Sequence, residues 1–200
     1  MQGARRTKTI LALLVGLILC GILRSAIATR LDSFDIDEAY HITAGVTYVR
    51  LGDYRLNPEH PPLIKLWVGA FLTPGIFKTP QLRPLAEKWD ERHFTETVVF
   101  TENDPDAAQR RVRLAMFILN GMLLLGFALA VWRAFGDKIG PLMAVGTLAF
   151  LIIDPTIAAH LPVVLTDLPV ALLGATAVLL AWSDVDALHA RKDSEPPGEG

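Results

Sequence analysis

Residues 10–27 read ILALLVGLILCGILRSAI, an apolar run broken by little more than Arg24. Comparable runs occupy residues 114–131, 141–153 and 168–182. A helix needs roughly 20 apolar residues to cross the ~30 Å core of a bilayer. The four runs therefore predict an all-α integral membrane protein with about four transmembrane helices.

The positive charges near the ends of these runs predict their orientation, because retained Lys and Arg mark the cytoplasmic side of a membrane. Arg5, Arg6 and Lys8 precede the first run, so we expect a cytoplasmic N-terminus in the plasma (inner) membrane. The predicted segments are a cytoplasmic N-terminus (1–9), a first transmembrane helix (10–27), an extracytoplasmic loop (28–109), three further transmembrane helices (110–182) and a disordered cytoplasmic tail (183–200). A small-residue site at Ala26-Ile27-Ala28 leaves cleavage of the first segment as a signal peptide open.

Charge and cysteine content exclude some functions. The formal net charge of -2 gives no general basic surface for nucleic acid, so we expect no nucleic-acid partner. Cys20 is the single cysteine, so the chain can form neither an internal disulfide nor a cysteine-based metal site.

The first loop is too long for a simple connection and should contain structure of its own. Apolar residues recur near helical spacing over residues 35–51, which predicts a juxtamembrane amphipathic helix lying on the bilayer. Gly52-Asp53 ends this helix, and Pro62 can open another over residues 63–71. Because residues 63–77 are apolar but interrupted by Lys65 and Pro74-Gly75, we expect that stretch to lie at the interface rather than to cross.

Ionisable side chains collect in the same loop. Asp37 and Glu38 could supply a general base for deprotonating a hydroxyl, although helix capping would also explain an acidic pair. The prolines after His60 fix the backbone and the direction of the imidazole, as a site or an ordinary turn would require. Glu38, His41, Glu59 and His60 could instead hold a divalent metal, the one cofactor that the sequence suggests.

Further candidates flank the later apolar runs. Arg110, Arg111 and Arg113 lie at the predicted outer end of the second run, where they could bind a phosphate or the headgroups of membrane lipids. Asp154, His160 and Asp167 bracket the predicted outer turn between the third and fourth runs. The predicted topology brings all of these residues to the same side of the membrane as Asp37.

The ordered combination resembles a known family. Asp37-Glu38, His60-Pro61-Pro62-Leu63 with Lys65, Arg113, and Asp154-Pro155 followed by His160 and Thr166-Asp167 look like the N-terminal half of polytopic glycosyltransferases of the GT-C fold. The likeness is greatest to the branch of protein O-mannosyltransferases and aminoarabinose transferases, and it extends over residues 1–182.

The resemblance implies transfer of a sugar from a polyprenyl- or dolichyl-phosphate donor to a hydroxyl acceptor on a protein, lipid or glycan. It makes Asp37 the catalytic base, with Glu38 beside it in acceptor or metal binding. It places His60, Lys65, Arg110, Arg113, Asp154, His160 and Asp167 among the substrate-binding residues. Family members have many more spans, so we expect either a truncated gene product or one half of a split enzyme, with a separate chain supplying the missing helices and this chain inactive alone. The alternative is a non-catalytic membrane protein that kept the fold to bind a lipid carrier or a partner.

Overall fold

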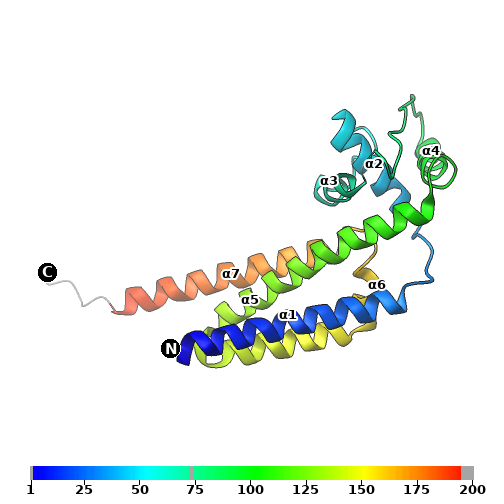
Figure 1. Ribbon diagram of the computed structural model, residues 1–200. Helices are drawn as coiled ribbons and strands as arrows, with labels where there is room; N and C mark the ends of the chain where they lie inside the picture. Colours follow the sequence, from blue (N-terminus) through cyan, green and yellow to red (C-terminus); the bar gives the residue numbers. More distant parts are fainter. Residues whose placement is uncertain (1, 73, 195–200) are drawn as a thin grey trace, which may run out of the picture.

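The computed structural model describes residues 2–72 and 74–194, and every regular element in these residues is a helix (Figure 1). Three helices are long and apolar enough to cross a membrane: α1 (Gln2–Ala28), α5 (Pro105–Ile153) and α7 (Asp167–Ser194). Their outward faces carry large apolar side chains such as Leu19, which is 60% exposed, as suits contact with lipid rather than water. The predicted all-helical fold is confirmed for the described residues, and three of its helices are able to cross a membrane by length and composition.

The helix α5 consists of two arms that meet at Gly136. This glycine has φ 68° and ψ 177°, a conformation that side chains disfavour, and the chain reverses there (Figure 1). Gly140 completes the reversal, because a side chain at that position would overlap the backbone carbonyl of Trp132. The arms contain the second and third predicted runs. A separate membrane crossing by each arm, and hence the count of four, stays a prediction.

Polar side chains join the helices at the end opposite this reversal. Arg24, the charge inside the first apolar run, donates from Nη1 to the carbonyl of Ile152 at 2.8 Å. Ser25 donates to the carbonyl of Ala158 in the short helix α6 (Pro155–His160) at 2.5 Å. Buried Asn120 donates to the carbonyl of Leu161 at 2.9 Å. These bonds fix the ends of α1 and the second arm of α5 beside α6.

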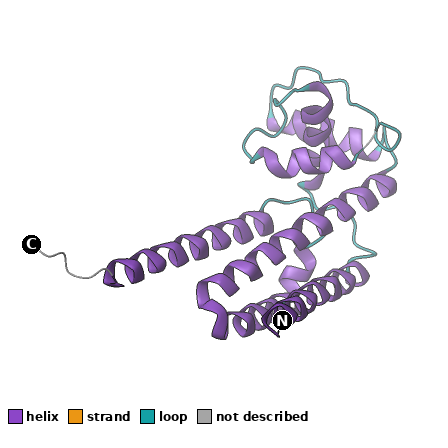
Figure 2. Ribbon diagram, turned by 60° about the vertical axis from the view of Figure 1, so that its left-hand side comes forward, coloured by secondary structure: helices purple, strands orange, loops and turns teal. Residues whose placement is uncertain are grey.

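Three shorter helices cover the start of α5: α2 (Glu38–Leu51), α3 (Pro62–Phe71) and α4 (Lys88–Phe100) (Figure 2). Their shared core includes Ile42, Val68 and Val99, all of which are fully buried. Trp67 ties α3 to α5 by donating to the carbonyl of Ala115 at 2.8 Å. The helix α4 begins with a reciprocal capping box between Glu87 and Asp90, two residues to which the sequence analysis gave no part.

The helix α2 differs from its prediction. It was expected to lie amphipathically on the bilayer, but every residue from Glu38 to Tyr48 is buried. The reason is that α3 and α4 both pack on it, and that Gly45 and Gly69 let the backbones of α2 and α3 come into direct contact. The apolar spacing within residues 35–51 does not show that two other helices, α3 and α4, will pack on α2.

The C-terminal segment also differs. The helix α7 continues to Ser194, so the predicted disorder from residue 183 is wrong for residues 183–194. Contacts with α5 explain part of this extension, since Arg133 pairs with Asp184 at 2.5 Å and Phe135 packs edge-on against Trp182. Residues 195–200, the rest of the predicted tail, lie outside the described residues.

Candidate functional site

A polar cleft of about 450 Å³ opens at the end of the long helices where α6 lies. Its walls come from the connection after α1, from Arg113 on α5, and from α6 with the turn that follows it. The chemically active side chains in these walls are those of Asp32, Asp35, Arg113 and His160. The cleft therefore combines one permanent cation, two carboxylates and one imidazole beside an apolar bundle.

Arg113 holds one wall of this cleft in place. Its Nη1 donates to the carbonyl of Thr29 and its Nη2 to the carbonyl of Asp32, both at 2.7 Å. Its Nε–H has no acceptor among the described residues, and none of their ion pairs includes this guanidinium. Arg113 thus brings a positive charge that is in no ion pair to the wall of the cleft.

Glu38 does not itself line the cleft, but it bonds to two of the segments that do. It is 1% exposed, and it accepts from the backbone N–H of Val164 at 2.9 Å and from that of Asp35 at 2.7 Å. Burial raises the pKa of this carboxyl, while the two backbone hydrogen bonds and the charge of Arg113 partly offset the rise. Glu38 joins the start of α2 to both chain segments that line the cleft, which is a structural part rather than that of an accessible base.

Asp37 has the opposite surroundings. It is exposed at the start of α2, its side chain makes no capping hydrogen bond, and it does not line the cleft. The carboxylate that does line the cleft is that of Asp35, whose Oδ1 accepts from the backbone N–H of Asp37 at 3.1 Å. No catalytic part was predicted for Asp35. Its spacing of three residues before Glu38, typical of a capping box, was a signal that the backbone turns at this point.

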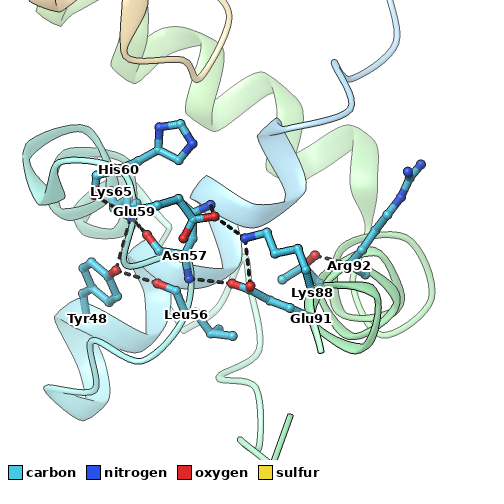
Figure 3. A network of polar contacts seen from close by, with 10 residues as sticks. Tyr48, Leu56, Asn57, Glu59, His60, Lys65, Lys88, Glu91 and Arg92 are labelled. Atoms are coloured by element: carbon cyan, nitrogen blue, oxygen red, sulfur yellow. Dashed lines mark hydrogen bonds and ion pairs between the residues drawn. The ribbon is translucent and has the colours of Figure 1, made fainter. Parts of the chain in front are cut away.

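Lys65 belongs to a separate polar network beneath the His60 turn (Figure 3). Its side chain is fully buried, and its ammonium donates to the carbonyl of Asn57, to that of His60 at 2.9 Å, and to the hydroxyl of Tyr48 at 3.2 Å. Burial lowers the pKa of Lys65 to about 8. Lys65 therefore fastens the turn onto α2, and it does not reach the cleft in which substrate binding was expected.

The same network extends to α4. Lys88 pairs with Glu59 and, at 2.8 Å, with Glu91, which also accepts from the backbone N–H of Asn57 at 2.5 Å (Figure 3). The contacts of Lys88 with Glu59 and of Glu91 with Asn57 connect the proline-rich turn to α4, whereas the Lys88–Glu91 pair lies within α4. The turn at residues 57–62 is therefore held in place by the charged side chains of Lys65, Lys88 and Glu91 as well as by its prolines.

The predicted metal site is not formed. His41 and His60 stack edge-on with ring centroids 5.1 Å apart, but Glu38 is bonded to backbone N–H groups and Glu59 to Lys88. Over residues 2–72 and 74–194, no three or more His, Cys, Asp or Glu side chains are grouped so that they could hold a metal ion. Glu38, His41, Glu59 and His60 are therefore not grouped as metal ligands in this structure, and a divalent metal stays a prediction.

The remaining candidates divide between capping, the cleft and the surface. Asp154 caps α6, accepting from the backbone N–H groups of Thr156 and Ile157 at 2.7 and 3.0 Å. His160 lines the cleft, with Nδ1 2.8 Å from the carbonyl of Thr156. Asp167 is exposed at the start of α7, and Arg110 lines a different cavity. Of the predicted site residues, only Arg113 and His160 therefore meet at the cleft.

Comparison of the chain with models of protein families, with curated proteins and with solved structures gave no match.

Proposed function

We propose that this chain is the N-terminal part of a membrane glycosyltransferase that moves a sugar from a polyprenyl- or dolichyl-phosphate donor to a hydroxyl acceptor. The observation that carries the proposal is the cleft itself, which places the guanidinium of Arg113 and the carboxylates of Asp32 and Asp35 at one end of an apolar bundle. A lipid-linked sugar presents its phosphate and sugar at such a boundary. The resemblance of the motifs to GT-C enzymes points to the same reaction class.

The reaction needs a base and a stabilised leaving group. In the proposed step, the acceptor oxygen attacks the anomeric carbon of the sugar, the bond from that carbon to the phosphate oxygen breaks, and the lipid phosphate leaves with the electron pair. The proton of the hydroxyl passes to a carboxylate, for which we propose Asp37. Asp37 does not line the cleft, but its backbone N–H donates to the cleft carboxylate of Asp35, so we propose that the acceptor binds at this rim of the cleft. The Asp37 side chain is exposed and makes no capping hydrogen bond, whereas Glu38 is buried.

Arg113 is the proposed contact for the donor phosphate. Positive charge fixed at the place where negative charge develops stabilises the transition state, and a guanidinium matches the geometry of phosphate oxygens. Arg113 is in no ion pair among the described residues and lines the cleft, so its charge is available to a phosphate bound there. His160, which also lines the cleft, is the proposed contact for a sugar or acceptor hydroxyl.

We further propose that both arms of α5 cross the membrane and that the cleft faces the extracytoplasmic side. The start of α1 and the reversal at Gly136 lie at the same end of the molecule (Figure 1). That end carries Arg5, Arg6 and Lys8 together with Lys138, as the positive-inside rule requires of a cytoplasmic face.

A non-catalytic protein that binds a lipid carrier is the second candidate. The observation that favours it is the structural use of predicted site residues: Glu38 and Asp154 bind backbone N–H groups, and Lys65 binds backbone carbonyls. Such a protein would use the cleft and the charge of Arg113 to bind the lipid carrier, and it would catalyse no sugar transfer.

The two candidates differ in sugar transfer. The chain would be produced alone and together with the product of the adjacent reading frame, and membranes would be assayed with radiolabelled polyprenyl-phosphate mannose and aminoarabinose. We expect transfer with both chains present and its loss in Asp37→Asn. Asp137→Asn, which changes an exposed aspartate beside the Gly136 reversal at the other end of the bundle, is the matched control and should retain transfer. Full transfer by Asp37→Asn would remove Asp37 as the base, and donor binding without any transfer would favour the carrier-binding protein.

A further inference from the structure

An apolar groove of about 390 Å³ runs between α1 and the first arm of α5. It opens outward, since Leu19 and Met122 on its two sides are 60% and 51% exposed. Its floor includes Gly121, where even a methyl group would come within 3.3 Å of the Ile22 side chain. The groove is therefore a depression that the protein's own side chains leave unfilled on a surface suited to lipid.

A polar cavity of about 520 Å³ continues this groove at the end nearest the cleft. Leu114 and Phe117 line both, so the two form one continuous surface that changes from apolar to polar. The polar part contains the guanidinium groups of Arg30, Arg110 and Arg113 and one carboxylate, that of Asp106. Arg30 and Arg110 are exposed. Positive charge thus exceeds negative charge where the groove ends.

We propose that this joint site binds an anionic phospholipid of the bilayer, with an acyl chain in the groove and the phosphate beside Arg30 and Arg110. Guanidinium groups are well matched to phosphate oxygens, and the apolar floor accepts a hydrocarbon chain. The site is distinct from the cleft, although Arg113 borders both cavities and so connects them. The proposal does not depend on the chain being a transferase.

Asp106 and Gln109 indicate which headgroup fits. A carboxylate beside a doubly charged phosphate monoester would repel it, whereas a singly charged phosphodiester carrying hydroxyls can donate to that carboxylate. Gln109 uses its amide nitrogen on the carbonyl of Asp32 at 3.3 Å, which leaves its amide oxygen for a second hydroxyl. A glycerol headgroup, as in phosphatidylglycerol, meets these requirements better than the bare phosphate of a polyprenyl carrier.

The test measures lipid binding by the purified full chain in detergent, by native mass spectrometry and by the shift in its unfolding temperature. Phosphatidylglycerol should bind and raise the unfolding temperature, while phosphatidylcholine of the same chain length should do so weakly. Arg110→Gln should weaken phosphatidylglycerol binding about tenfold, and Ile118→Trp should block it by filling the groove.

Each variant has a matched control on the same helix. Arg133→Gln removes the same charge from an exposed arginine that lines neither the groove nor the polar cavity. Leu129→Trp adds the same ring at a residue 39% exposed, against 40% for Ile118. Both controls should bind phosphatidylglycerol as the parent does. Equal binding of the two phospholipids, equal losses in variants and controls, or binding of polyprenyl phosphate with none of phosphatidylglycerol would overturn the proposal.

Discussion

Asp37 and Glu38 are neighbours in the chain whose side chains face different surroundings. Glu38 accepts two hydrogen bonds from backbone N–H groups in a fully buried position, whereas Asp37 is exposed. Replacing Glu38 by Gln removes one of the two acceptor oxygens and leaves a buried N–H group facing an amide nitrogen. We expect Glu38→Gln to lower the free energy of unfolding by about 1–3 kcal/mol, measured by thermal unfolding in detergent.

Asp37→Asn is the control for this prediction, because it makes the same chemical change at the adjacent residue. Its stability should stay within about 0.5 kcal/mol of the parent, as is usual for exposed positions. Equal destabilisation by both substitutions would show that Glu38 does not hold the cleft wall through its two acceptor oxygens.

His41 makes stability depend on pH. Its imidazole is buried against His60, and burial, with smaller effects from the charges of His60 and Lys65, lowers its pKa from 6.5 to about 4. Between pH 6.5 and about 4, the imidazole of His41 is protonated in the unfolded chain and neutral in the folded chain. The contribution of His41 is therefore present above pH 6.5 and is lost as the pH falls toward 4, by at most about 3 kcal/mol.

His41→Phe keeps a ring at this position and removes its titration. We expect the variant to lose less stability than the parent between pH 6.5 and 4, measured by urea unfolding at fixed temperature. The raised pKa of Glu38 acts in the opposite direction, favouring the folded state as the pH falls, but it is common to both proteins and cancels in the comparison. Parallel pH profiles for the two proteins would contradict the prediction.

Among the helices, α2 and α3 depend on two glycines for their contact. A methyl group at Gly45 would overlap the carbonyl oxygen of Lys65, and one at Gly69 would overlap the carbonyl oxygen of Gly45. Backbone atoms cannot move aside as a flexible side chain can. We expect Gly45→Ala to destabilise the protein by about 2 kcal/mol or more and to expose the α2–α4 segment to limited proteolysis.

Gly174→Ala provides the contrast within α7. No atom lies within 4 Å of a side chain added there, so the substitution should be neutral or stabilise the helix by up to about 1 kcal/mol. If Gly45→Ala behaved like Gly174→Ala, α2 and α3 would not be packed backbone to backbone.

The long helices could be predicted from the sequence and the α2–α3 contact could not. An apolar run such as residues 10–27 specifies a helix through its own length and composition, which are local properties. The burial of α2 depends on which other helices cover it, and the sequence leaves that open. The same limit applied to the site, since Lys65 and Asp154 have the residue types of a binding site but bond to backbone groups close to them in the chain.

At the scale of the whole molecule, the proposed function requires the two ends of the helix bundle to face opposite sides of the membrane. The candidate span in α1, Gly3–Ala28, has 26 residues, and a helix of that length extends about 39 Å, enough to cross a ~30 Å hydrocarbon core. The bonds from Arg24 and Ser25 to Ile152 and Ala158 hold the far ends of α1 and α5 together. The cleft and the Gly136 reversal should therefore lie on opposite sides of the membrane.

Side-specific labelling measures this arrangement. In a Cys20→Ala background, single cysteines at Leu31, which is 86% exposed, at Thr156 and at Lys138 would be treated with a membrane-impermeant maleimide in intact spheroplasts. We expect Leu31→Cys and Thr156→Cys to react from outside, and Lys138→Cys to react only after permeabilisation, because the two arms of α5 each traverse the bilayer. Reaction of all three from outside would mean that α5 does not cross twice. Reaction of Lys138→Cys alone would place the cleft in the cytoplasm, where an extracytoplasmic lipid-linked sugar could not reach Arg113.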